Sequence, residues 1–210
     1  MKRNLLPDLM YSKSGQGHNG SSNGGSTTVV DYSNPIEPVV YLTDINNNLY
    51  IIPRCMAGQK FNINTDKCDA TGNSANNYGM LYAQWCSTNT NDCNRGMLNW
   101  LILHQSYLNG SYSEAHNYCW NLKYAGYTNY RVFHHDEYYH LYKNGIIDSV
   151  LYPNMISGDV WSGGHSIPGV YSVADKAVVY NVAAKTKRHD TKTTRYPFRC
   201  VKALNELLIP

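Results

Sequence analysis

Residues 195–204, RYPFRCVKAL, decide the fold that the sequence predicts. Their apolar residues indicate a short strand, in which Cys200 stands far downstream of the nearest preceding cysteine, Cys119. We expect Cys119 to lie on the buried face of a helix. A disulfide between these two cysteines would tie that helix to the last strand and close a loop of about 80 residues.

The chain has six cysteines in 210 residues, and an even number favours a disulfide framework. Their spacing lacks the tight two-residue gaps of zinc knuckles, so we predict no metal site among them. Pairing between sequence neighbours is the simplest connectivity for the first four, although the count alone leaves other pairings open. The predicted bonds are Cys55–Cys68, Cys86–Cys93 and Cys119–Cys200. Disulfides persist in oxidising compartments, so we expect an extracellular or cell-surface protein.

Composition and charge exclude several classes of protein. Charged residues make up 16% of the chain and the net charge is +3, which is too small to indicate nucleic-acid binding. No apolar run is long enough to span a membrane, so we expect no membrane insertion. The start, MKRNLLPDLM, lacks the apolar core of a signal peptide, and we therefore expect the export signal to lie outside this chain.

The chain divides into a predicted linker and a predicted domain. Residues 1–30 contain a Gly, Ser and Asn-rich segment without apolar periodicity, which is typical of a flexible linker. The linker implies display from stalk, pilus or fibre subunits upstream. Residues 31–210 are predicted to form a single disulfide-stabilised domain, with a Cys-rich portion at 31–95 and a second portion at 96–210.

The second portion predicts an α+β fold of two helices with short antiparallel strands. In SYSEAHNYCWNLKYAG, Ser111 and Glu114 indicate a capping box and Gly126 a helix stop. A second helix is expected over residues 135–145, HDEYYHLYKNG. The segments DVWSGG, GVYSV, KAVVYNVAA and YPFRCVKA then indicate strands separated by turns.

An ordered series of residues in this portion resembles a known family. The series is Ala115, Tyr118, Cys119, Leu122, Gly126, Tyr130, Arg131, Glu137, Trp161, Ser162, Arg199, Cys200 and Val201. Over residues 110–204 it resembles the Lcl C-terminal family, a bacterial domain formerly of unknown function. Phe133 and His134 depart from that family's pattern at the entry to the second helix. The resemblance implies a C-type-lectin-like fold and, because some members bind sulfated glycans, a glycan ligand.

Most of the conspicuous residues have a structural interpretation. Arg131 and Glu137 are predicted to form an ion pair that positions the second helix, and Trp161 is predicted to lie in the core. The eight histidines lack the spacing of a zinc motif, and a pH-responsive patch is the remaining hypothesis. The calcium-binding signatures of sugar-binding C-type lectins are missing from this half of the chain, so we expect sugar binding without calcium.

We predict no enzymatic activity and no cofactor. Formylglycine-generating enzymes share the lectin-like architecture, but their reactive cysteines are free thiols, whereas each cysteine here has a predicted disulfide partner. No pair of carboxylates and no nucleophile beside a base stands out in the sequence.

The strongest candidate site is the basic stretch KTKRHDTKTTR. Its cations are Lys185, Lys187, Arg188, Lys192 and Arg195. In a strand-turn-strand, Lys185 and Lys187 would share one face and Arg188 would begin the turn. Such a group could bind sulfates or phosphates of a glycan, or it could be a solvated hairpin tip.

The sequence therefore predicts an extracellular bacterial adhesin, or a tip domain of a pilus or fibre, that binds a host polyanionic glycan or lipopolysaccharide through aromatic and Lys/Arg side chains. The alternative is a structural or protein-binding cap of a pilus or phage fibre with no glycan preference. Whether the domain forms a homo-oligomer stays open.

Overall fold

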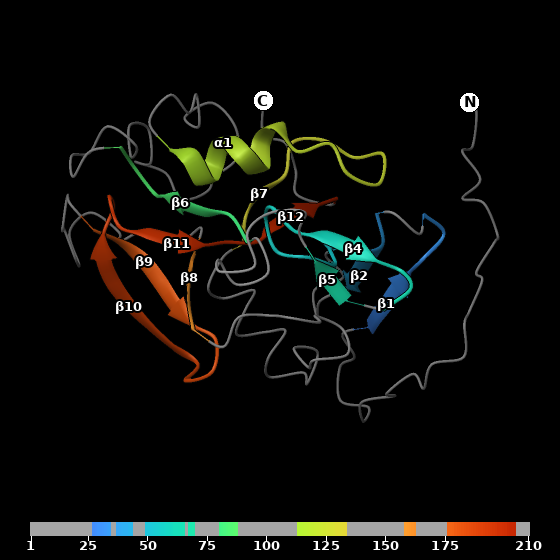
Figure 1. Ribbon diagram of the computed structural model, residues 1–210, viewed down its shortest axis with the longest axis horizontal. Helices are drawn as coiled ribbons and strands as arrows, with labels where there is room; N and C mark the ends of the chain where they lie inside the picture. The colour runs from blue at the N-terminus through green and yellow to red at the C-terminus, as the bar shows by residue number, and fades with distance from the viewer. Residues whose placement is uncertain are drawn as a thin grey trace.

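The computed structural model describes residues 27–34, 37–43, 49–65, 67–69, 80–87, 113–133, 158–162 and 176–204 of the chain (Figure 1). Within these residues twelve short strands accompany one helix, α1 (Glu114–Asn121). The predicted α+β, C-type-lectin-like fold with two helices is therefore wrong, and the described chain is mostly β. The second helix was expected at residues 135–145, which lie outside the described residues.

The physical reason for the β-rich fold is the type of residue that fills these segments. Strand β9 (Lys176–Asn181) reads KAVVYN and β3 (Leu49–Pro53) reads LYIIP. β-Branched and aromatic side chains lose rotamer freedom in a helix but pack well on a pleated sheet. The strands expected in DVWSGG, KAVVYNVAA and YPFRCVKA are present, whereas GVYSV lies outside the described residues.

The N-cap of helix α1 lies two residues later than predicted. The Ser113 hydroxyl accepts a hydrogen bond from the His116 amide at 3.3 Å and caps the first turn. The predicted capping box of Ser111 with Glu114 is therefore wrong. Glu114 is the first helical residue, where a carboxylate interacts favourably with the helix dipole.

A tight turn after α1 explains why Gly126 does not end the helix. Tyr124 and Tyr127 exchange backbone hydrogen bonds at 2.9 and 3.1 Å. Between them Ala125 and Gly126 have φ values of 49° and 81°, and positive φ at both central residues defines a type I′ turn. Gly126 is thus a turn residue, while α1 already ends at Asn121.

The larger sheet joins the two predicted portions of the chain. Its strand order is β1-β2-β3-β12-β7, and every pairing is antiparallel. The bounds are β1 (Thr27–Asp31), β2 (Val39–Thr43), β7 (Arg131–Val132) and β12 (Cys200–Ala203). Strand β12, from the C-terminal stretch, lies between β3 and β7. Because β1 begins at Thr27, the strand starts inside the predicted linker of residues 1–30.

Three smaller sheets complete the described structure. A three-stranded antiparallel sheet has the order β10-β9-β8, with β8 (Asp159–Trp161) and β10 (Thr186–Thr191) on either side of β9. Strand β6 (Tyr82–Gln84) pairs with β11 (Arg195–Pro197), and β4 (Lys60–Asn62) pairs with β5 (Lys67–Asp69). Figure 1 shows α1 above β6 and β11, with β10 at the outer edge of its sheet.

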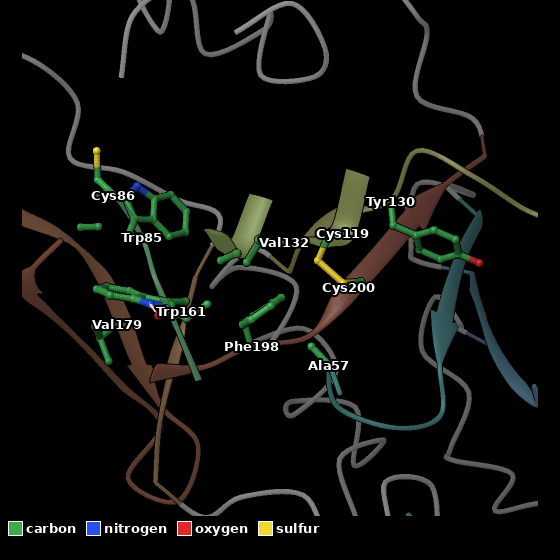
Figure 2. Close-up of a cluster of buried hydrophobic side chains, with 13 residues drawn as sticks. Ala57, Trp85, Cys86, Cys119, Tyr130, Val132, Trp161, Val179, Phe198 and Cys200 are labelled. Atoms are coloured by element: carbon green, nitrogen blue, oxygen red, sulfur yellow. Dashed lines mark hydrogen bonds between the residues drawn. A yellow bond between two sulfur atoms is a disulfide. The ribbon is translucent and has the colours of Figure 1, made fainter. Parts of the chain in front are cut away.

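Two disulfide bonds confirm the predicted framework where the structure describes it. Cys119 of α1 is bonded to Cys200 of β12, and both side chains are buried. Figure 2 shows this bond among buried side chains that include Val132 and Phe198. Cys55 is bonded to Cys68. These bonds indicate that the chain folds in an oxidising environment.

Only one cysteine of the third predicted disulfide, Cys86–Cys93, lies within the described residues. Cys86 is disulfide-bonded, while Cys93 lies outside the described residues. Within the described residues no cysteine is a free thiol.

Arg199, from the Arg-Cys pair of the C-terminal stretch, is a core residue. It is 1% exposed, and its Nη1 atom donates hydrogen bonds to the carbonyls of Pro53 at 2.9 Å and Arg54 at 3.3 Å. Arg54 is equally buried, and its guanidinium lies 5.0 and 5.1 Å from the ring centroids of Tyr32 and Phe61. The Arg199 hydrogen bonds satisfy backbone acceptors at the end of β3 and hold that end against the segment before β12. The Arg54 guanidinium makes cation–π contacts with the two rings.

Candidate anion-binding surface

The basic stretch folds into β10 and the turns at its two ends. Its first turn covers residues 182–185 and its second follows Thr191, so Arg188 lies in the middle of a strand. The prediction that Arg188 begins the turn is therefore wrong. The turn comes earlier because the Asn181 side chain accepts a hydrogen bond from the Ala184 amide at 2.8 Å, and the Asn181 carbonyl accepts one from the Lys185 amide, also at 2.8 Å.

The pairing register sorts the residues of this sheet onto two faces. Residues directly opposite one another share a face, and successive residues of a strand alternate between faces. One face carries Thr186, Arg188, Asp190, Ala177, Val179, Asn181, Asp159 and Trp161. The other carries Lys187, His189, Thr191, Lys176, Val178, Tyr180 and Val160. Both acidic residues of the sheet are therefore on the first face.

Arg188 is the centre of a polar network on the first face. Its guanidinium donates to Asp159 Oδ2 at 2.6 Å, Asp190 Oδ2 at 2.9 Å and the Tyr196 hydroxyl at 2.8 Å. The Tyr196 hydroxyl donates to Asp190, and the Asn181 side chain donates to Asp159 Oδ1 at 2.8 Å. The network joins three strands of the sheet to β11.

The network balances the charge of Arg188. Partial burial raises the pKa of Asp159, but hydrogen bonds from Arg188 and Asn181 outweigh this and bring the pKa below its ordinary value. The hydrogen bond from Tyr196 does most to lower the pKa of Asp190. Hydrogen bonds to Asp159 and then Asp190 raise the pKa of Arg188. Two carboxylates and one guanidinium therefore stay ionised at neutral pH, so Arg188 contributes no excess positive charge.

Lys192 is not on the surface. It is 0% exposed, and its backbone carbonyl accepts hydrogen bonds from the amides of Trp85 at 2.9 Å and Cys86 at 3.1 Å. The segment after β10 is thereby held against the segment that follows β6. A buried ammonium cannot reach a ligand at the protein surface.

Arg195 belongs to an ion pair between β11 and the first residue of α1. Its Nη1 and Nη2 atoms donate to the two carboxylate oxygens of Glu114 at 2.9 and 2.8 Å. Nη1 also donates to the Tyr82 carbonyl at 2.9 Å, and Glu114 accepts from the Gln84 amide at 3.1 Å. This bidentate geometry holds α1 against β6 and β11.

The second face of the sheet carries basic side chains at the positions that are not buried. Lys187 is exposed, and His189 and Lys176 are half-buried; we call these three residues the cationic face. Lys187 makes no ion pair within the described residues. Lys185 precedes β10 in an exposed turn, with a φ of 59°. On this side of the three described strands there is no acidic residue to balance the charge.

The predicted site did not include Lys176 or His189. The two-residue period of β10 would have placed His189 beside Lys187 once the strand bounds were known. Lys176 is brought in by the pairing with β9, where it lies opposite Thr191. Because Lys176 and Thr191 are 15 residues apart, no local pattern indicates their contact.

Of the tryptophans and the ion pair that the sequence singled out, the structure describes some residues and not others. Trp161 lies in the core, where its indole nitrogen donates to the Ala83 carbonyl at 2.7 Å (Figure 2). Trp85 is also fully buried, and its ring centroid lies 5.6 Å from that of Trp161. Arg131 is half-buried, whereas Glu137 lies outside the described residues, so their predicted ion pair stays a prediction.

Within the described ranges, no group of three or more histidine, cysteine, aspartate or glutamate side chains could hold a metal ion. No described helix has the length and hydropathy needed to cross a membrane. The chain matches no protein-family model, no curated protein and no solved structure.

Proposed function

We propose that this chain is an extracellular recognition domain of a bacterial adhesin, pilus tip or fibre, and that it binds an anionic glycan at the cationic face without calcium. The observation that supports the proposal is the separation of charge in the three-stranded sheet. Arg188, Asp159 and Asp190 balance one another on one face, while Lys187, His189 and Lys176 gather on the other. A surface with excess cations on a disulfide-bonded scaffold suits a host polyanionic glycan or the phosphates of lipopolysaccharide.

The binding chemistry follows from the side chains that reach solvent. A lysine ammonium binds a sulfate, phosphate or carboxylate as a point charge with three donors. Trp85 and Trp161 are buried, so stacking on these two rings is not part of the proposed mechanism. Exposed ion pairs are individually weak, so we expect weak binding at one site that is strengthened by display of many copies.

The experiment is heparin-affinity chromatography of Lys187→Ala beside Lys123→Ala. Both lysines are exposed, and Lys123 follows α1, outside the three-stranded sheet. The two variants lose the same formal charge, so a difference between them reports position and not net charge. We expect Lys187→Ala to elute at lower salt than the wild type and Lys123→Ala to elute with it.

A glycan array of sulfated, phosphorylated and neutral sugars then separates the two proposed sources of ligand. Signal on sulfated sugars supports a host glycan, and signal on phosphorylated sugars supports lipopolysaccharide. Equal elution of the two lysine variants would contradict the assignment to the cationic face.

The second candidate function is a protein-binding cap. Among the described residues β10 pairs with β9 on one side, and the order β10-β9-β8 places it at the sheet edge. An edge strand can accept a strand from another protein through backbone hydrogen bonds. A folded protein with no heparin retention and no array signal would favour this function over glycan binding.

A further inference from the structure

We propose that the cationic face holds one linear glycan at two separate points, an anchor at Lys176 and a second contact at Lys187. The anchor combines the Lys176 ammonium with the paired hydroxyls of Thr191 and Thr194. The ligand is then an oligosaccharide whose negatively charged groups lie on different sugars, far enough apart to reach both points. This inference deepens the proposed function and rests on it, because it concerns the same surface and an anionic glycan.

The hydrogen bonds of β9 show that Lys176 and Thr191 approach closely. The Val178 carbonyl accepts a hydrogen bond at 3.1 Å from the amide of Ser162, the residue after β8. Backbone groups two residues apart in a strand point to the same side, so Lys176 also directs its backbone toward β8 and away from β10. It therefore forms a non-hydrogen-bonded pair with Thr191. In such pairs the Cα atoms are only about 4.5 Å apart and the side chains lie close together.

The hydroxyls beside Lys176 supply a hydrogen-bond donor. The side-chain oxygens of Thr191 and Thr194 lie 2.7 Å apart, so one hydroxyl donates to the other. Each hydroxyl has one proton, so the accepting hydroxyl can still donate its own proton to a ligand oxygen. The turn after β10 fixes the pair, because the Thr194 amide donates to the Thr191 carbonyl at 3.0 Å. An ammonium and a hydroxyl donor thus meet at one place, which suits a sulfate or carboxylate.

Lys187 lies too far from this anchor to bind the same anionic group. It precedes Thr191 by four residues along β10, which is about 13 Å at the rise of an antiparallel strand. Side chains stand roughly perpendicular to a sheet, so the ammonium groups of Lys187 and Lys176 keep a similar separation. Neither lysine forms an ion pair within the described residues. A single sulfate is too small to contact both, whereas a linear chain with charges on several sugars can do so.

The first experiment compares two ligands by NMR titration at constant ionic strength, a monosaccharide with one sulfate group and a heparin-derived hexasaccharide. Lys176→Ala should weaken binding of both ligands by a similar factor, because each occupies the anchor. Lys187→Ala should weaken the hexasaccharide about two- to fivefold more than the monosaccharide, as befits one exposed ion pair. Lys123→Ala, which lies outside the sheet, is the control for the loss of one charge.

The second experiment tests the hydroxyl pair with isosteric substitutions. Replacement of both Thr191 and Thr194 by valine removes the two hydroxyls of the anchor. The control replaces Thr186, which is exposed on the opposite face of β10, and Thr128, which is exposed outside the sheet. We expect the first double variant to bind both ligands at least about twofold more weakly, as for one lost hydrogen bond, and the control to bind as the wild type does. Urea unfolding of each variant establishes that it is folded.

The outcomes separate failure of this inference from failure of the proposed function. Equal weakening of the two ligands by Lys187→Ala overturns the two-point arrangement. Wild-type affinities in the variant that lacks Thr191 and Thr194, or no binding of the monosaccharide to the wild type, overturns the anchor. In each of these cases hexasaccharide binding at the cationic face still stands. No binding of the hexasaccharide to the wild type, or wild-type hexasaccharide affinity in Lys187→Ala, overturns the proposed function as well.

Discussion

Arg188 and Lys187 are adjacent in the chain but have different environments. Arg188 faces two carboxylates and Tyr196, over whose ring the guanidinium carbon lies 5.7 Å from the centroid. Lys187 points to the other side of β10, where no acid of the sheet lies. One residue of register decides which cation stabilises the fold and which is available to a ligand.

Removal of Arg188 should reduce stability in a pH-dependent way. We expect Arg188→Ala to lower the free energy of unfolding by about 1 kcal/mol at neutral pH, a modest loss because the network is partly exposed and screened by solvent. The folded-state pKa values of Asp159 and Asp190 lie below the ordinary value of 3.8. The stabilisation is therefore complete above that value and disappears as the pH falls through the folded-state pKa values.

Urea unfolding of the wild type and Arg188→Ala over a pH series measures this effect. The gap between the two midpoints should close below about pH 3.8, with Lys123→Ala as the control that shows no such closing. A gap of constant size from neutral to acid pH would show that ionised carboxylates are not the source of the stabilisation.

At the scale of the element, a tight turn follows α1 and prevents the helix from continuing. The helix ends at Asn121, and the type I′ turn at Ala125 and Gly126 returns the chain toward β7. The turn is held from outside as well, because the Glu37 carboxylate accepts a hydrogen bond from the Ala125 amide at 2.8 Å. The Tyr124 hydroxyl also donates to the Pro38 carbonyl at 2.9 Å. Contacts with the segment before β2 therefore help to select a turn where the local sequence could continue a helix.

Two opposite substitutions test this turn. Gly126→Ala should lower the free energy of unfolding by about 1 kcal/mol, since a side chain is disfavoured at positive φ. No atom lies within 4 Å of the new Cβ position, so the cost is conformational and not steric. Ala125→Gly should raise stability by about 0.5 kcal/mol for the same reason. Equal effects of the same sign in thermal unfolding would contradict a type I′ turn.

At the scale of the whole molecule, the Cys119–Cys200 bond joins the elements that surround the core. It links α1 to β12, which is itself hydrogen-bonded to β3 and β7. The bond spans 81 residues, whereas Cys55–Cys68 spans 13. In the chain-entropy model the bond that closes the longer loop contributes more to the free energy of unfolding, about 4.5 kcal/mol against about 3 kcal/mol.

Paired alanine variants compare the two bonds. Replacement of both Cys119 and Cys200 should lower the urea midpoint more than replacement of both Cys55 and Cys68. The first pair also leaves a space in the core, because Cys119 is fully buried, which adds to the loss. An equal or larger loss from the short loop would show that the bonds act through local packing and not through chain entropy.

Much of the framework could be predicted from the sequence alone. The even number and spacing of cysteines predicted both described bonds, and the runs of β-branched and aromatic residues predicted β8 and β9. The stretch YPFRCVKA was predicted as one strand and forms two, β11 and β12, in different sheets. These features are local or are set by covalent chemistry, so they can be recognised without knowledge of distant contacts. The basic stretch was recognised as well, but as one group of cations.

Only the tertiary structure decided which of those cations are available to a ligand and which distant strands pair with one another. The Lys192 side chain is buried and its backbone is bound by the Trp85 and Cys86 amides, Arg195 is bound by Glu114, and Arg188 is neutralised across β8 and β10. The fold class itself depended on the pairing of β12 with β3, at the other end of the chain. Such pairings come from burial of apolar surface that residues far apart share, and one residue of register moves a side chain from the core to the solvent.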